Sequence, residues 1–182
     1  GVVHLPLVLP PVVVGYLLLV MFGRRGLIGE WLYDLFGITL AFTWRGAVLA
    51  SAVMAFPLMV RAIRLALEAV DIRLEAAART LGASRWRVFF TITLPLTLPG
   101  IIVGTVLAFA RSLGEFGATI TFVSNIPGET RTLPSAMYTL IQTPGGEGAA
   151  ARLCVIAIVL ALCSLMFSEW LARQSRRRLG AS

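Results

Sequence analysis

The stretch that decides the fold class is residues 75–110, EAAARTLGASRWRVFFTITLPLTLPGIIVGTVLAFA, in which a short charged segment precedes a long uncharged one. No Asp, Glu, Lys or Arg occurs from Val88 to Ala110. A helix needs about 20 mostly apolar residues to cross the hydrocarbon core of a bilayer. The stretch therefore predicts a membrane-spanning helix over residues 88–111, preceded by an exposed loop over about residues 64–87.

The composition of the whole chain supports the same interpretation. Of the 182 residues, 58% are hydrophobic and only 14% are charged, whereas a soluble domain is about half apolar and about a quarter charged. Three further apolar runs predict spans over residues 2–22, 44–63 and 152–171. We therefore predict an all-α membrane protein, a polytopic helical bundle of about four spans that forms a single transmembrane domain over residues 1–182.

The segments between the predicted spans carry weaker signals. Residues 23–43 contain charged and aromatic side chains and predict a short helix on the membrane surface. Residues 116–126 are apolar but too short to span, so we expect a re-entrant or periplasmic helix there. A short helix is also predicted over residues 135–142, and Gly145–Gly148 predicts a flexible outer loop, since no Gly-Lys-Ser/Thr follows it.

The basic residues indicate an orientation. All sixteen are Arg, and the formal net charge is +7. Six lie in residues 61–87 and four in residues 173–178, two regions that four alternating spans place on the same side. Arg concentrates in cytoplasmic loops of membrane proteins. The C-terminus is therefore predicted to be cytoplasmic, and no nucleic-acid partner is needed to explain the charge.

Side chains suited to catalysis or metal binding are sparse. Cys154 and Cys163 are nine residues apart in one apolar run, roughly 13 Å along a helix, which is too far for a disulfide. His4 is the only histidine and is assigned no role. The sequence contains no convincing nucleophile–base or metal constellation. We therefore predict no catalytic residue, no metal site and no cofactor in this chain.

The loop before the third predicted span carries the sharpest motif. It resembles the EAA loop of ATP-binding-cassette importer permeases, in which EAA, a Gly and I-x-L-P recur at fixed spacing. Counting back from Gly82, Ala76, Ala77 and Ala78 fall on the EAA positions, and Glu75 lies one residue earlier. The remaining matching positions are Ile92, Leu94 and Pro95.

The resemblance extends over almost the whole chain. Segments 4–11, 109–117 and 127–130 are similar to molybdate and sulfate permeases, and residues 12–16, 23–26 and 134–138 are closest to the molybdate permeases. This family normally has an additional span before the position of residue 1, so we expect an N-terminally truncated permease.

The resemblance implies a mechanism. It implies the type I importer fold and alternating access in the bacterial inner membrane, with a cytoplasmic coupling helix that docks on an ATPase. The coupling residues would be Glu75, Ala76, Ala77, Ala78 and Gly82. The implied partners are a second copy of the chain, two cassette ATPase subunits that bind ATP and Mg, a periplasmic molybdate-binding protein, and membrane lipid. Sulfate, thiosulfate and tungstate are alternative substrates, and a stand-alone anion channel or carrier is the alternative from another class.

Four polar residues near the end of the third predicted span are candidates for the translocation path. Arg111 and Glu115 are four residues apart and share a helix face. Arg111 could attract a tetrahedral oxyanion, with Ser112 or Thr119 donating hydrogen bonds to it. Alternatively, Arg111 and Glu115 pair with each other and stabilise helix packing. Both interpretations are consistent with the sequence.

Overall fold

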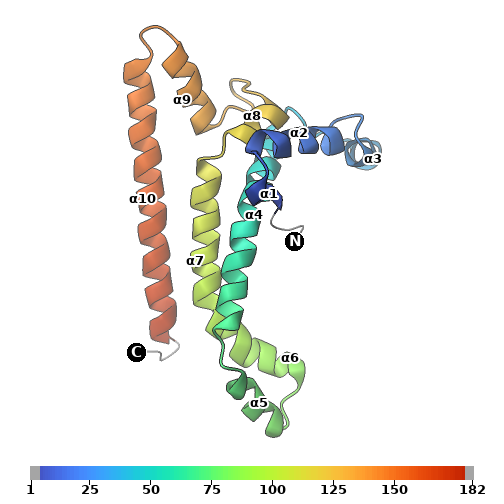
Figure 1. Cartoon of the computed structure of the whole chain (residues 1–182), viewed down its shortest axis with the longest axis vertical. Helices are drawn as coiled ribbons and strands as arrows, with labels where there is room; N and C mark the ends of the chain where they lie inside the picture. The colour runs from blue at the N-terminus through green and yellow to red at the C-terminus, as the bar shows by residue number, and fades with distance from the viewer. Residues whose placement is uncertain (1–4, 179–182) are drawn as a thin grey trace. The chain divides into compact units, whose positions relative to one another are not determined.

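Helices form every regular element that the structure describes. The computed structural model describes residues 5–178, and Figure 1 shows their succession. The elements are α1 (Leu5–Val8), α2 (Pro11–Phe22), α3 (Leu27–Phe36), α4 (Trp44–Glu68), α5 (Ile72–Thr80), α6 (Arg85–Val88), the π-helix η2 (Phe89–Thr93), α7 (Leu94–Leu113), α8 (Gly117–Val123), α9 (Leu133–Gln142) and α10 (Glu147–Arg178). The predicted all-α class is confirmed.

Three helices are long and apolar enough to cross a membrane. They are Trp44–Glu68, the continuous run Arg85–Leu113 made of α6, η2 and α7, and Glu147–Leu171 within α10. These helices carry the segments in which the sequence predicts the second, third and fourth spans. Each helix is longer than its predicted span.

The segment predicted as the first span is divided. Residues 2–4 lie outside the described part, α1 ends at Val8, and α2 begins again at Pro11. Pro10 and Pro11 explain the break, because proline lacks an N–H donor and disfavours helix at the preceding residue. The 12 residues of α2 rise only about 18 Å. α2 is long and apolar enough to cross a membrane only when it is counted together with α3, which follows it at an angle of 48°.

The chain divides into two compact units. One contains Gly1–Pro57 and Phe109–Ala161, and the other contains Leu58–Ala108 and Leu162–Ser182. The helices α4, α7 and α10 each contribute residues to both units, so no linker separates them. The prediction of one transmembrane domain over residues 1–182 stays a prediction.

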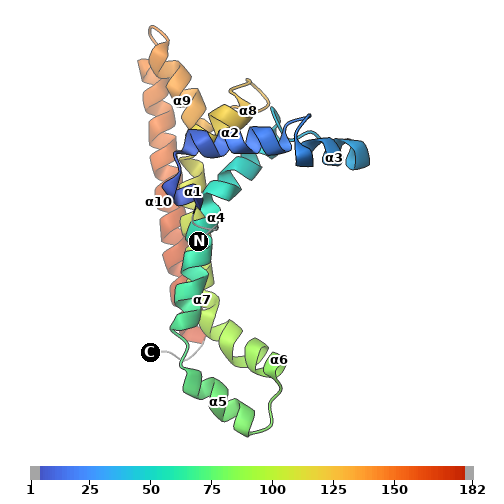
Figure 2. The ribbon, with the colours of Figure 1, turned by 45° about the vertical axis from the view of Figure 1, so that its right-hand side comes forward.

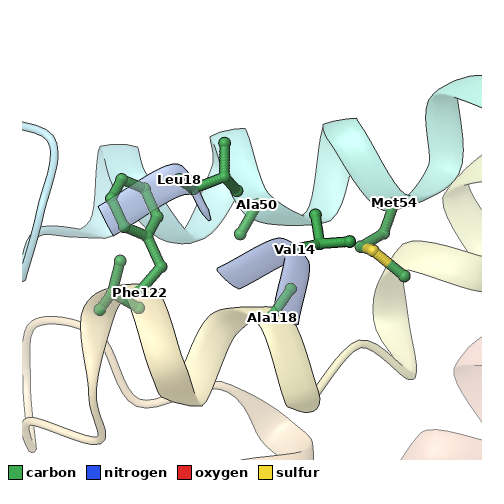
Figure 3. Packing of buried hydrophobic residues seen from close by; sticks show 7 residues of the cluster. Val14, Leu18, Ala50, Met54, Ala118 and Phe122 are labelled. Carbon is green, nitrogen blue, oxygen red and sulfur yellow. The ribbon is translucent and has the colours of Figure 1, made fainter. Parts of the chain in front are cut away.

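The first unit is organised around α2. Figure 3 shows α2 between α4 and α8, with apolar side chains from all three helices directed at one another. Gly15 permits this approach, because a Cβ there would lie 2.6 Å from the Ala118 carbonyl oxygen. The buried cluster consists of Val14, Leu18, Ala50, Met54, Ala118, Phe122 and Val123.

The second unit is held together by small residues. A Cβ on Gly104 of α7 would lie 2.5 Å from the Cβ of Ala62 on α4, and Gly100 meets Ala66 still more closely. Such residues let helix backbones approach within the membrane, where close packing stabilises helix pairs. In the same unit, α5 folds back against α6 and η2 (Figure 2).

The π-helix lies two residues before a proline. Pro95 has no N–H, so the regular hydrogen-bond ladder of the helix cannot be completed there. The wider turn at Phe89–Thr93 adapts the helix just before this position. Thr93, the last residue of η2, is buried.

Several weaker sequence expectations can be compared with these elements. The short helices expected within residues 23–43, 116–126 and 135–142 correspond to α3, α8 and α9. The flexible loop expected over residues 145–148 is wrong for its second half, because Glu147 and Gly148 already belong to α10. The aromatic side chains that follow α5 are exposed in this chain; they are Trp86, Phe89 and Phe90.

Candidate functional site

The predicted coupling helix corresponds to α5 and has defined caps. The Asp71 side chain accepts a hydrogen bond from the Arg73 amide at 2.8 Å, which satisfies one free donor of the first turn. At the other end, Gly82 has φ +85°, a left-handed conformation that glycine adopts readily. The amides of Gly82 and Ala83 donate to the carbonyls of Arg79 and Ala78, a Schellman motif. The sequence thus specifies a nine-residue helix with a sharp stop.

The two faces of α5 differ in exposure. Its outer face is solvent-accessible in this chain, and Ile72 is 77% exposed. The inner face carries Glu75 and Ala78, which are half-buried. The outer face consists of Ile72, Arg73, Ala76, Ala77 and Thr80, which lie within an arc of about 140° around the helix axis at about 100° per residue. The residues that the sequence groups together as coupling residues therefore lie on different faces.

Glu75 is engaged within the chain. The Thr93 hydroxyl donates to Glu75 Oε1 at 2.6 Å, and Arg79 Nη2 lies 3.6 Å from Glu75 Oε2. The Glu75 side chain is only 24% exposed. Sequence reasoning does not single out Thr93, although a hydroxyl at the variable position of I-x-L-P, inside an apolar run, is a detectable signal.

The second candidate group is centred on Glu115, which lies between α7 and α8. Its carboxylate is 1% exposed and accepts from Arg111 Nη1 at 3.0 Å and from the Ala118 amide at 2.9 Å. The second bond satisfies a donor in the first turn of α8, where negative charge is favoured. Glu115 therefore joins the last turn of α7 to the first turn of α8.

The two hydroxyl candidates are directed elsewhere. Ser112 donates to the Phe109 carbonyl at 2.7 Å, and Thr119 donates to the Phe116 carbonyl at 2.9 Å. Each hydroxyl has a single proton, so in this conformation neither proton is available to an anion. Arg111 differs, because its side chain is 39% exposed and its guanidinium has five N–H donors.

Metal-binding side chains are scattered within the described residues. No group of three His, Cys, Asp or Glu side chains in the described part of the chain could hold a metal ion. Cys154 and Cys163 are both free. His4, the only histidine, lies outside the described residues.

Comparison with known proteins decides the class. Residues 1–178 match the family described as binding-protein-dependent transport system inner membrane component. The chain belongs to this family. It is therefore a membrane permease component, and transport permeases of this kind are not enzymes.

Individual relatives of the permease agree with this assignment. The molybdenum transport system permease protein ModB of Escherichia coli K12 is 84% identical over 180 residues, which cover 99% of this chain and 79% of that protein. ModB of Haemophilus influenzae is 69% identical over the same shares of both chains. A putative molybdenum transport system permease protein of Bacillus subtilis, YvgM, is 45% identical over 163 residues, 90% of this chain and 71% of that protein.

Proposed function

We propose that this permease is the membrane-spanning subunit of an ATP-driven importer that carries molybdate into the cell by alternating access. The observation that carries the proposal is 84% identity, over 99% of the chain, to a molybdenum transport system permease. Tungstate, sulfate and thiosulfate are the competing substrates to be tested.

The outer face of α5 supports an ATPase partner. A short, capped helix that exposes Ala76 and Ala77 lets the backbone of another protein approach closely. Exposed apolar side chains such as Ile72 and Leu81 would be covered by that partner. We propose that a cassette ATPase, which binds ATP and Mg, docks on this face, with two ATPase copies serving two permease copies.

The exposed surface of α10 supports contact with lipid and with a second permease copy. Large apolar side chains are exposed around most of this helix, away from the covered stripe that includes Ala157, Ala161 and Ser168, and apolar surface of this extent is normally covered by lipid or by protein. They include Val155, Ile156, Ile158, Val159, Leu162 and Met166. We propose that lipid and the second copy of a homodimer share this surface.

Orientation follows from the Arg distribution. We propose that α5 and the C-terminus face the cytoplasm, because residues 61–87 and 173–178 hold ten of the sixteen Arg residues. A periplasmic molybdate-binding protein would then deliver the anion at the opposite side. There Arg111 is the proposed anion contact, since it keeps donors that Glu115 does not use. Ser112, Glu115 and Thr119 would complete the path only if their present hydrogen bonds change.

Reconstitution tests the proposal. The permease is placed in proteoliposomes with or without the cassette ATPase and the binding protein, and uptake of labelled molybdate is measured against excess sulfate or tungstate. We expect uptake that requires all three proteins and ATP. Uptake at full rate without the ATPase would refute the proposal and favour a stand-alone channel or carrier.

Deletion of residues 73–82 separates the two classes further. A channel or carrier needs no docking helix, so its transport would survive the deletion. An ATP-driven permease would lose transport while still inserting in the membrane.

A further inference from the structure

We propose that the hydrogen bond from Thr93 to Glu75 joins α5 to the start of the span that follows, so that movement of α5 is transmitted to α7. Thr93 and Glu75 would then be positioning residues for coupling, acting inside the chain rather than on the ATPase. The proposal rests on the proposed function, because it assumes that an ATPase moves α5.

The bond is well placed for this role. It connects residues 18 positions apart, at 2.6 Å, between a buried hydroxyl and a carboxylate that is mostly covered. Among the residues that the structure describes, the other side-chain hydrogen bonds and ion pairs of α5 remain within residues 71–80. The Thr93–Glu75 bond is therefore the side-chain polar link from α5 to the following helices.

The π-turn explains why Thr93 is available. Residues of an α-helix are separated by about 100° around its axis, so the extra residue in a π-turn changes which side chain faces a neighbouring element. Thr93 ends η2 and faces Glu75. Its sequence neighbours Ile92 and Leu94 could not donate a hydrogen bond from their side chains. The π-turn thus places the Thr93 hydroxyl, rather than an apolar side chain, against Glu75.

The geometry argues against a contact between the Glu75 side chain and a partner protein. One carboxylate oxygen accepts from Thr93, and the other lies near Arg79. Ala76 and Ala77 occupy the exposed side of the helix instead. The outer face of α5 would bind the ATPase, and the inner face would pass the movement on.

Three substitutions test the link. Thr93→Val removes the hydroxyl at nearly constant volume, and Thr93→Ser retains it. Thr91→Val is the matched control, because Thr91 lies in the same π-turn but its hydroxyl donates to the Arg87 carbonyl of its own helix at 2.6 Å.

Amide hydrogen exchange of residues 72–80 in the reconstituted permease reports the link directly. We expect Thr93→Val to accelerate exchange about tenfold, because α5 loses a hydrogen bond to a charged group. Thr93→Ser and Thr91→Val should remain within about twofold of the original protein. Unchanged exchange in Thr93→Val would overturn the proposal.

Coupling is measured as molybdate transported per ATP hydrolysed, with the ATPase and binding protein present. We expect Thr93→Val to lower this ratio at least about fivefold, with ATPase binding retained and Thr93→Ser restoring it. If exchange accelerates but the ratio is unchanged, the bond is only structural and the proposal fails. If the original permease neither binds nor uses the ATPase, the proposed function fails instead. This outcome distinguishes a failure of the proposed function from a failure of the Thr93–Glu75 link.

Discussion

Replacing Arg111 should destabilise the permease more than replacing its partner Glu115. Arg111→Ala leaves the Glu115 carboxylate buried with only the Ala118 amide as a partner. Glu115→Gln removes the charge but keeps an acceptor for that amide. The two variants therefore break the same ion pair with different consequences for the buried group.

The magnitudes follow from burial. Breaking a buried pair by removing one partner costs about 3–5 kcal/mol of unfolding free energy. Because the Arg111 side chain is 39% exposed, solvent screening reduces the expected loss for Arg111→Ala to about 2–3 kcal/mol. Glu115→Gln should cost about 1 kcal/mol, because it reduces a charge-assisted hydrogen bond, worth about 1.5–3 kcal/mol, to a neutral one, worth about 0.5–1.5 kcal/mol.

A second ion pair of the same spacing provides the control. Arg64 Nε lies 2.7 Å from Glu68 Oε1, but the two side chains are 75% and 57% exposed. Exposed pairs contribute little, so Arg64→Ala should change the unfolding free energy by less than about 1 kcal/mol.

Equilibrium unfolding of the purified permease in mixed detergent–lipid micelles, followed by tryptophan fluorescence, measures all three variants. The expected order of destabilisation is Arg111→Ala, then Glu115→Gln, then Arg64→Ala. If Arg111→Ala costs no more than Arg64→Ala, burial of Glu115 does not determine the energetics and the reasoning is refuted.

Three further predictions concern packing and docking. Gly15→Ala should destabilise the permease by about 1–3 kcal/mol in the same assay, because the added Cβ would meet the Ala118 backbone. Gly148→Ala is the control and should be near neutral, because nothing lies within 4 Å of a Cβ there. Equal effects of the two substitutions would contradict the packing argument. Phe122→Ala should cost about 3–5 kcal/mol, because the ring is fully buried, and a loss below that of Gly148→Ala would contradict this. Ala77→Trp, on the outer face of α5, should abolish co-purification with the ATPase and leave unfolding unchanged; retained co-purification would exclude this face as the docking surface.

Local signals explain the parts of the fold that could be predicted. Long uncharged runs indicate a bilayer, and the glycine of the motif, Gly82, follows the end of α5 with a positive φ. The prediction of a span over residues 2–22 stays a prediction; the structure divides the segment between α1 and α2 at Pro10 and Pro11, which lack N–H donors. The sequence allows two interpretations of Arg111 and Glu115, and the structure shows the two paired.

The sequence by itself determined the membrane class, the helical segments and the resemblance to importer permeases, because these depend on composition, periodicity and short spacings. Only the tertiary structure decided that Glu75 meets Thr93 and that Glu115 is buried between Arg111 and the first turn of α8. The physical reason is that burial and hydrogen-bond partners depend on which helix faces meet. Helix faces change with a single π-turn, and linear spacing does not record that change.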